Sequence, residues 1–175
     1  MNNGHCEDSD SLVIGVGNPI RADDNIGRVV VDLLRSRAPA SVRLIERDGE
    51  ATALLADLQS ARRAWLIDAA QSGAQAGTVH RIDCAGNALL PRRSVSSHGF
   101  GLAEAVALAR ALGGLPPHCI VYAIEAAEFT PGAAPSPAVM RAAGEVADAI
   151  LAELATPQPP STRRPPHRAP APDRR

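Results

Sequence analysis

The amino-acid sequence predicts an α/β fold, a three-layer α/β/α sandwich built around a mostly parallel sheet. Short apolar runs alternate along the chain with segments whose apolar residues recur every three to four positions. The loops between these segments are short, and the sequence contains no internal repeat. Strands that alternate with helices pair in parallel and carry helices on both faces of the sheet. At 175 residues, the chain is long enough for one such domain with a sizeable core.

Each expected element follows from its local pattern. The strands are five runs of β-favouring apolar residues, at 11–16, 42–46, 64–68, 78–83 and 119–125. The helices carry one apolar face each and are expected at 26–33, 51–59, 102–112 and 139–154. The two glycines at 113–114 are typical of a helix C-terminus and mark the end of the third helix.

The two ends of the chain differ in composition from the middle. The opening residues are polar and acidic, and the last twenty are dense in proline and arginine. Neither end has apolar residues to bury, so we expect disordered tails at 1–10 and 156–175 around a single domain at 11–155. From Ala155 onward the chain has five Arg and one Asp, a charge of +4, which leaves −5 for the remainder of a chain whose total is −1.

This composition argues against several classes of protein. The mildly acidic body offers no basic surface for nucleic acid. No apolar run approaches the ~20 residues that a membrane span needs, and the polar N-terminus is unlike a secretory signal. The three cysteines form no CxxC pair and are too scattered for a disulfide framework. We therefore expect a cytoplasmic protein by elimination.

The stretch "VIGVGNPIRADDNIG" (13–27) indicates a strand that runs through a glycine turn into a helix. A dinucleotide-binding fingerprint would need a third glycine where this chain has Ile20. Pro19 also directs the chain away from immediate entry into a helix, because the residue before a proline avoids the α region. The Gly-Lys-Ser/Thr of a phosphate-binding P-loop is absent. Nucleotide binding is therefore a distant alternative.

Two adjacent aspartates follow this turn. One of them can cap the following helix and complement its dipole, which is worth about 0.5–2 kcal/mol. Since one aspartate satisfies that need, the second carboxylate is left to point into a cleft, and Asp24 is the candidate for facing a cation there. The alternative is that both Asp23 and Asp24 serve only the start of the helix.

Two further polar residues stand where a strand or loop gives way to a helix. Asp68 ends the apolar strand 64–68, where a carboxylate is costly unless it is paired, hydrogen-bonded or bound to a cation; the alternative is a turn residue. His98 lies at the start of the third helix, whose dipole disfavours imidazolium, so a neutral ring is available as a ligand or base. The alternative for His98 is an exposed loop histidine.

We expect Asp24, Asp68 and His98 to gather at the carboxyl ends of the strands. Two carboxylates and one imidazole form an incomplete coordination sphere for a divalent first-row metal. Such a set suits a metal that arrives with the substrate, or one that polarises a carbonyl for hydrolysis. A serine hydrolase is less consistent with the sequence, which has no G-x-S-x-G nucleophile elbow.

The chain resembles the nickel-iron hydrogenase maturation proteases over about residues 12–154. The motifs that carry the resemblance are "GVGNPIRADDNIG" (15–27), "LIDAA" (66–70) and "SSHGFGLAEAVALA" (96–109). The resemblance implies an α/β sandwich with a five-stranded sheet, and nickel contacts through Asp24, Asp68 and His98. Asn25 departs from the glycine common after the acidic pair, and "DGEAT" (48–52) lacks a second glycine.

The same resemblance implies an activity. We expect an aspartic-type endopeptidase that removes a short C-terminal extension from the hydrogenase large-subunit precursor after nickel insertion. Asp24, Asp68 and His98 would be both the catalytic and the metal-contacting residues, and the substrate would supply the nickel. We expect the chain to act as a monomer on this partner. The alternative is a non-catalytic module or chaperone that binds the nickel-loaded subunit without cutting it.

Overall fold

The structure is a computed structural model that describes residues 10–86 and 102–156. Apart from Asp10 and Thr156, both expected tails lie outside this described part. The strands are β1 (Ser11–Val16), β2 (Val42–Arg47), β3 (Arg63–Ala70), β4 (Val79–Asp83) and β5 (His118–Glu125). The helices are a 3₁₀ turn η1 (Ala22–Asn25), then α1 (Ile26–Arg35), α2 (Ala51–Gln59), α3 (Leu102–Ala111) and α4 (Pro137–Leu154).

The five strands form one sheet in the order β2-β1-β3-β5-β4. β1 runs parallel to β2 and β3, and β3 runs parallel to β5. Only β4, the outermost strand on one side, is antiparallel to its neighbour. The expected five-stranded, mostly parallel α/β sheet is therefore confirmed. We use "carboxyl edge" for the edge of the sheet at which β1, β2, β3 and β5 end.

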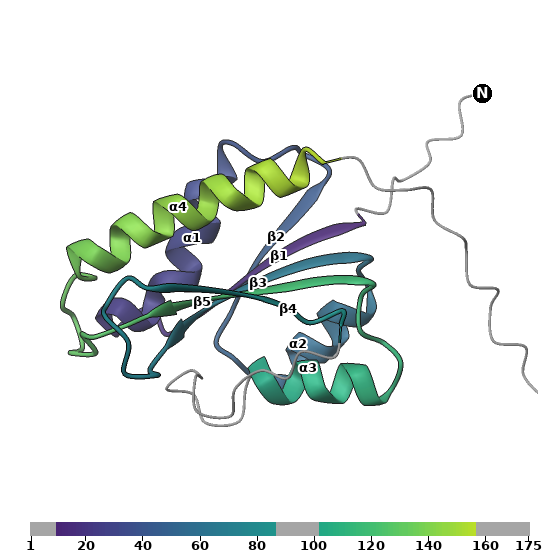
Figure 1. The fold of residues 1–175 in the computed structure, drawn as a ribbon, viewed down its shortest axis with the longest axis horizontal. Coiled ribbons are helices and arrows are strands. Elements are labelled where there is room, and N and C mark those ends of the chain that lie inside the picture. The colour runs from purple at the N-terminus through teal and green to yellow at the C-terminus, as the bar shows by residue number, and fades with distance from the viewer. Residues whose placement is uncertain (1–9, 87–101, 157–175) are drawn as a thin grey trace, which may run out of the picture.

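Helices cover both faces of the sheet and complete the three layers (Figure 1). α1 and α4 pack against each other on one face, and α2 and α3 pack together on the other. None of the described helices combines the length and the apolar character needed to cross a membrane.

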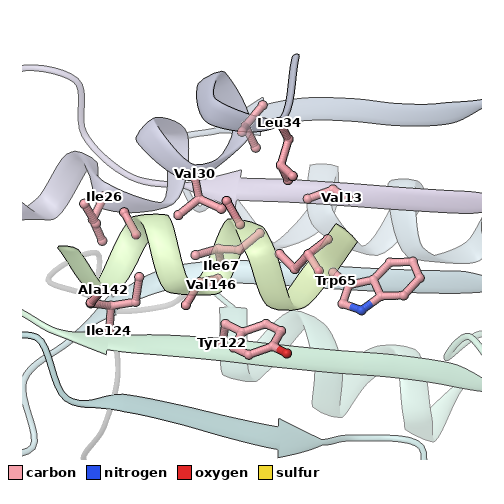
Figure 2. Close-up of a cluster of buried hydrophobic side chains, with 14 of the residues drawn as sticks. Val13, Ile26, Val30, Leu34, Trp65, Ile67, Tyr122, Ile124, Ala142 and Val146 are labelled. Atoms are coloured by element: carbon pink, nitrogen blue, oxygen red, sulfur yellow. The ribbon is translucent and has the colours of Figure 1, made fainter. Parts of the chain in front are cut away.

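Two apolar clusters fill the space between the layers, because successive side chains of a strand point to opposite faces. Figure 2 shows the cluster under α1 and α4, in which β3 contributes Trp65 and Ile67. The cluster under α2 and α3 receives Ala64 and Leu66 from the same strand. This alternation assigns Asp68 to the face that carries α2 and α3.

Two local expectations are wrong. Asp68 does not end its strand, because β5 continues beside β3 and pairs with it up to Ala70 opposite Glu125. The aspartates do not cap α1 with their side chains either, since a 3₁₀ turn containing them precedes the helix and Asn25 occupies its N-cap position. The glycine stop after α3 is confirmed, with Gly113 at φ +70°.

Candidate functional site at the carboxyl edge

The glycines of the first turn bring backbone segments into direct contact at the carboxyl edge. A Cβ atom at Gly17 would lie 2.3 Å from the carbonyl oxygen of Asp24. A Cβ at Gly27 would lie 2.2 Å from the Val16 carbonyl oxygen and 2.4 Å from that of Ile67. Such distances exclude any side chain, so these positions require glycine. These glycines therefore serve close backbone packing between the first turn, the start of α1 and the strand ends.

This packing brings the η1 segment, which holds Asp24, against the end of β3, which holds Asp68. The Ile67 carbonyl that touches Gly27 belongs to the residue directly before Asp68. Both carboxylates are buried, with exposed fractions of 0% for Asp24 and 2% for Asp68. One oxygen of Asp68 accepts a hydrogen bond from the Ala69 N–H at 2.8 Å. The structure thus places two of the three candidate residues at one edge; His98 lies outside the described residues.

Asp23 has a different task from its neighbour. Its carboxylate accepts hydrogen bonds from the backbone N–H groups of Ala127 at 3.0 Å, Glu128 at 2.9 Å and Ser136 at 2.6 Å. It also accepts one from the Ser136 hydroxyl at 3.2 Å. These partners belong to the loop between β5 and α4, more than 100 residues along the chain. Asp23 therefore fastens that loop to the segment that carries Asp24.

The residue before Asp23 has an unusual backbone conformation. Ala22 is buried and has a φ of +27°, the one positive φ at a non-glycine residue in the described part of the chain. A non-glycine residue held in a sparsely populated region costs about 1–3 kcal/mol and persists only where its surroundings fix it. The hydrogen bonds of Asp23 supply such fixation. Strain beside two buried aspartates is typical of a functional segment.

Glu125, the last residue of β5, is a second buried carboxylate that holds a loop. It is 2% exposed and accepts hydrogen bonds from the Ser72 hydroxyl at 3.0 Å and from the N–H groups of Gly73 at 2.7 Å and Ala74 at 3.1 Å. Because this loop directly follows β3, Glu125 fixes the chain just beyond Asp68. Sequence reasoning missed Glu125, although an acidic residue ending an apolar strand is the same signal that identified Asp68.

The chemistry of this edge suits a cation. Within the described ranges, the buried charged residues are all acidic and all lie here: Asp23, Asp24, Asp68 and Glu125. Two of the four are occupied with loop backbone, as described above. Carboxylates such as those of Asp24 and Asp68 are suitable ligands for a divalent metal ion. The described residues contain no group of three His, Cys, Asp or Glu side chains arranged to hold one.

The chain is similar to proteins of hydrogenase assembly. The model of a family described as "Hydrogenase maturation protease" matches residues 28–153. The "Hydrogenase expression/formation protein HupM" of Azotobacter chroococcum is 31% identical over 157 residues, which cover 84% of this chain and 75% of that protein. HupD of Thiocapsa roseopersicina is 28% identical over 125 residues; this match spans 70% of the chain but only 57% of the relative's length.

Solved structures agree with the sequence comparisons. The hydrogenase maturating endopeptidase HybD from E. coli superposes with a TM-score of 0.70 at 26% identity, over 82% of this chain and 90% of that one. The fold is also that of a [NiFe] hydrogenase maturation protease, HycI, from Thermococcus kodakarensis, with a TM-score of 0.66 at 20% identity over 84% and 94% of the two chains. With this fold and the match over residues 28–153, the chain belongs to the hydrogenase maturation protease family.

Proposed function

We propose that the chain is an endopeptidase that removes the C-terminal extension of a nickel-loaded hydrogenase large-subunit precursor. The observation that carries the proposal is the placement of Asp24 and Asp68, two buried carboxylates from different segments, at one edge of the sheet. Membership of a maturation protease family supports the hydrolytic activity and the class of substrate. The site is then a place where a cation carried by another protein can be recognised.

In this proposal, Asp24, Asp68 and His98 contact nickel that the precursor carries. Carboxylate and imidazole groups are suitable ligands for such a metal, and three of them leave positions for the precursor's own ligands. Nickel belongs to the substrate, so the protease needs no resident metal of its own. The reaction would take place in the cytoplasm, with one monomer acting on one precursor.

Two mechanisms are compatible with these residues. In the first, the contacts to nickel align the scissile peptide bond beside the metal, which polarises the carbonyl for attack by water. In the second, Asp24 or Asp68 takes a proton from the attacking water as a general base, in the manner of an aspartic protease, and nickel only positions the substrate. Either way, a carboxylate at this edge is required.

The purified chain should be incubated with nickel-loaded precursor and, in parallel, with the same precursor prepared without nickel. Intact-mass spectrometry then follows both mixtures. We expect the nickel-loaded precursor to lose the mass of its C-terminal extension and the nickel-free precursor to remain whole. A stable complex at full mass would instead identify a binding module or chaperone. Equal cleavage of both forms would contradict the role given to nickel.

A further inference from the structure

Ile20 is a large apolar side chain that the fold holds in solvent beside the candidate site. Its exposed fraction is 64%, above those of the other exposed large hydrophobic residues in the described part of the chain. It lies in the loop between β1 and η1, four residues before Asp24. A single exposed isoleucine needs no explanation by itself. Ile20 is notable because hydrogen bonds hold its backbone in place and because it lies close to Asp24.

The backbone around Ile20 is fixed on both sides. The Ile20 N–H donates to the side-chain oxygen of Asn18 at 3.1 Å, and the Ile20 carbonyl accepts from the Gly132 N–H at 2.8 Å. The next residue, Arg21, forms an isolated β-bridge with Pro131. The exposure of Ile20 is therefore a feature of an ordered loop whose shape is set by hydrogen bonds.

The neighbouring side chains reinforce this arrangement. The Arg21 guanidinium lies over the Phe129 ring, 5.8 Å from its centroid, and its Nε donates to the Phe129 carbonyl at 3.5 Å. The strained Ala22 and the four hydrogen bonds of Asp23 complete the connection to the β5–α4 loop. We call this pair of joined loops, residues 18–24 and 126–136, the rim.

The rim connects Ile20 to the site by a short, rigid path. The Asp24 N–H donates to the Arg21 carbonyl at 2.8 Å, and the Asp24 carbonyl accepts from the Asn18 N–H at 3.2 Å. Four residues span at most about 14 Å even when fully extended. A folded protein that presents a metal ion to Asp24 must therefore bring its own surface close to Ile20.

We propose that Ile20, at the apex of the rim, contacts an apolar patch on the precursor's surface next to its nickel and thereby contributes to substrate selection. This inference rests on the proposed function and adds a contact outside the set of metal-binding residues. The precursor is the occupant that the geometry favours, because Ile20 and Asp24 belong to one hydrogen-bonded loop. The strained backbone at Ala22 fits this role, because a loop that is already rigid loses little conformational freedom on binding.

Leu112 supplies a matched control. It is 62% exposed and directly follows α3, whose C-terminal end leads to the start of β5, away from the carboxyl edge (Figure 1). Ile20→Asp, Ile20→Ala and Leu112→Asp would be compared with the unmodified chain for thermal stability, for the Kd of nickel-loaded precursor, and for kcat and KM of cleavage. Light scattering of each variant would give its molar mass.

We expect Ile20→Asp to raise both Kd and KM at least tenfold, with kcat changed less than twofold, and Ile20→Ala to produce a smaller rise in the same direction. Leu112→Asp should leave all three within twofold. Unchanged Kd and KM in Ile20→Asp, alongside normal cleavage by the unmodified chain, would overturn the inference alone. A dimer that becomes a monomer in Ile20→Asp, with Kd unaltered, would also overturn it, by assigning Ile20 to self-association.

A failure of the proposed function gives a different pattern. If the unmodified chain binds the nickel-loaded precursor but does not cut it, the peptidase assignment fails, while the Kd of Ile20→Asp still decides the inference. A tenfold weaker complex then supports the contact, and an equal Kd rejects it. If the unmodified chain neither binds nor cuts, both proposals fall together.

Discussion

The two ends of the sheet treat acidic groups differently. At the carboxyl edge, the carboxylates of Asp24 and Asp68 lie buried next to strained and glycine-dependent backbone. Toward the other end, the single carboxylate of Glu153, near the end of α4, is surrounded by donors from three strands of the sheet. The first arrangement resembles a site prepared for a ligand, and the second a structural anchor.

The anchor is a compact set of charge-assisted and aromatic contacts. Glu153 accepts hydrogen bonds from the Trp65 indole N–H at 2.7 Å, the Tyr122 hydroxyl at 2.6 Å and the Arg81 Nε at 2.9 Å. The Arg63 guanidinium stacks on Trp65, 4.6 Å from the ring centroid. Figure 2 shows the polar tips of Trp65 and Tyr122 at the border of the apolar cluster under α4. Because the three donors come from three different strands, these hydrogen bonds fix where the end of α4 docks on the sheet.

Burial alone therefore does not distinguish a candidate ligand from an acid that holds the fold together. Asp23 and Glu125 are as buried as Asp24 and Asp68, and their oxygens accept hydrogen bonds from N–H groups of loops that are distant in the sequence. The carboxyl edge thus combines anchors with candidate ligands. Substitutions at each end should separate loss of activity from loss of stability.

The largest effect is expected for Asp68→Asn, which keeps the shape of the side chain and removes its charge. Both proposed mechanisms need this carboxylate, so kcat/KM for the nickel-loaded precursor should fall at least ~100-fold, the lower range for loss of an acid–base group. Asp32→Asn, an exposed aspartate on α1, is the control and should cleave normally. Normal processing by Asp68→Asn would rule out both mechanisms.

The next largest effect is expected for Gly27→Ala. A Cβ here meets two backbone carbonyl oxygens at 2.2 and 2.4 Å, so β1 and β3 must move apart from the start of α1. Overpacking against backbone should lower the free energy of unfolding by about 3 kcal/mol. Gly144→Ala is the control, because its Cβ would meet nothing within 4 Å in the middle of α4. That variant should gain about 0.5–1 kcal/mol in urea unfolding, since alanine is the better helix former.

Asp23→Ala should have an intermediate effect. The substitution leaves the partly buried N–H groups of Ala127, Glu128 and Ser136 without their acceptor, and a donor that loses its partner costs about 1–3 kcal/mol where water cannot replace it. We expect a loss of about 2 kcal/mol in the free energy of unfolding, together with faster amide hydrogen exchange in residues 126–136. Exchange at the level of the unmodified chain would show that Asp23 does not fasten this loop.

The smallest effect is expected at the structural anchor and depends on pH. Burial alone would raise the pKa of Glu153, but the hydrogen bonds from Arg81, Tyr122 and Trp65 outweigh it and lower that pKa below the usual 4.5. A lowered carboxyl pKa gives stability that is present above the unfolded value and is lost as the pH falls through the folded one. Glu153→Gln should therefore be about 1 kcal/mol less stable at pH 7.

This deficit should shrink as the pH falls from about 5 to below 4.5, because the unmodified chain then loses its own contribution from Glu153. Thermal melts of both proteins across this range measure the difference. Cleavage at pH 7 should be unchanged in Glu153→Gln, because the anchor lies away from the carboxyl edge. A deficit that stays constant with pH would contradict the charge-assisted character of these contacts.

Most of the fold could be predicted from the sequence because its pattern is local. Alternating apolar runs and helical periods indicate the elements, and the glycines of the first turn indicate tight packing after β1. The extent of β3 beyond Asp68 could not be predicted, since it depends on pairing with β5, a strand fifty residues away. The antiparallel direction of β4, the outermost strand, could not be predicted either, because it depends on tertiary packing.

Part of the candidate site could be predicted from the sequence, because a polar residue near the end of a strand is expected at the carboxyl edge. Asp24 follows the turn after β1 and Asp68 lies near the end of β3, and the carboxyl ends of parallel strands share one edge. The separate task of Asp23 could not be foreseen, because its partners are distant in sequence and are backbone groups of an irregular loop. The solvent-exposed position of Ile20 likewise depends on a bridge between two loops.

The central claim is that carboxylates at the carboxyl edge contact nickel held by another protein. Nickel-edge X-ray absorption measures this directly, on nickel-loaded precursor alone and on mixtures frozen within seconds of adding the unmodified chain or Asp68→Asn. The account predicts additional oxygen or nitrogen ligands on nickel with the unmodified chain and fewer with Asp68→Asn. A nickel spectrum that stays the same in all three samples, although the complex forms, would contradict it.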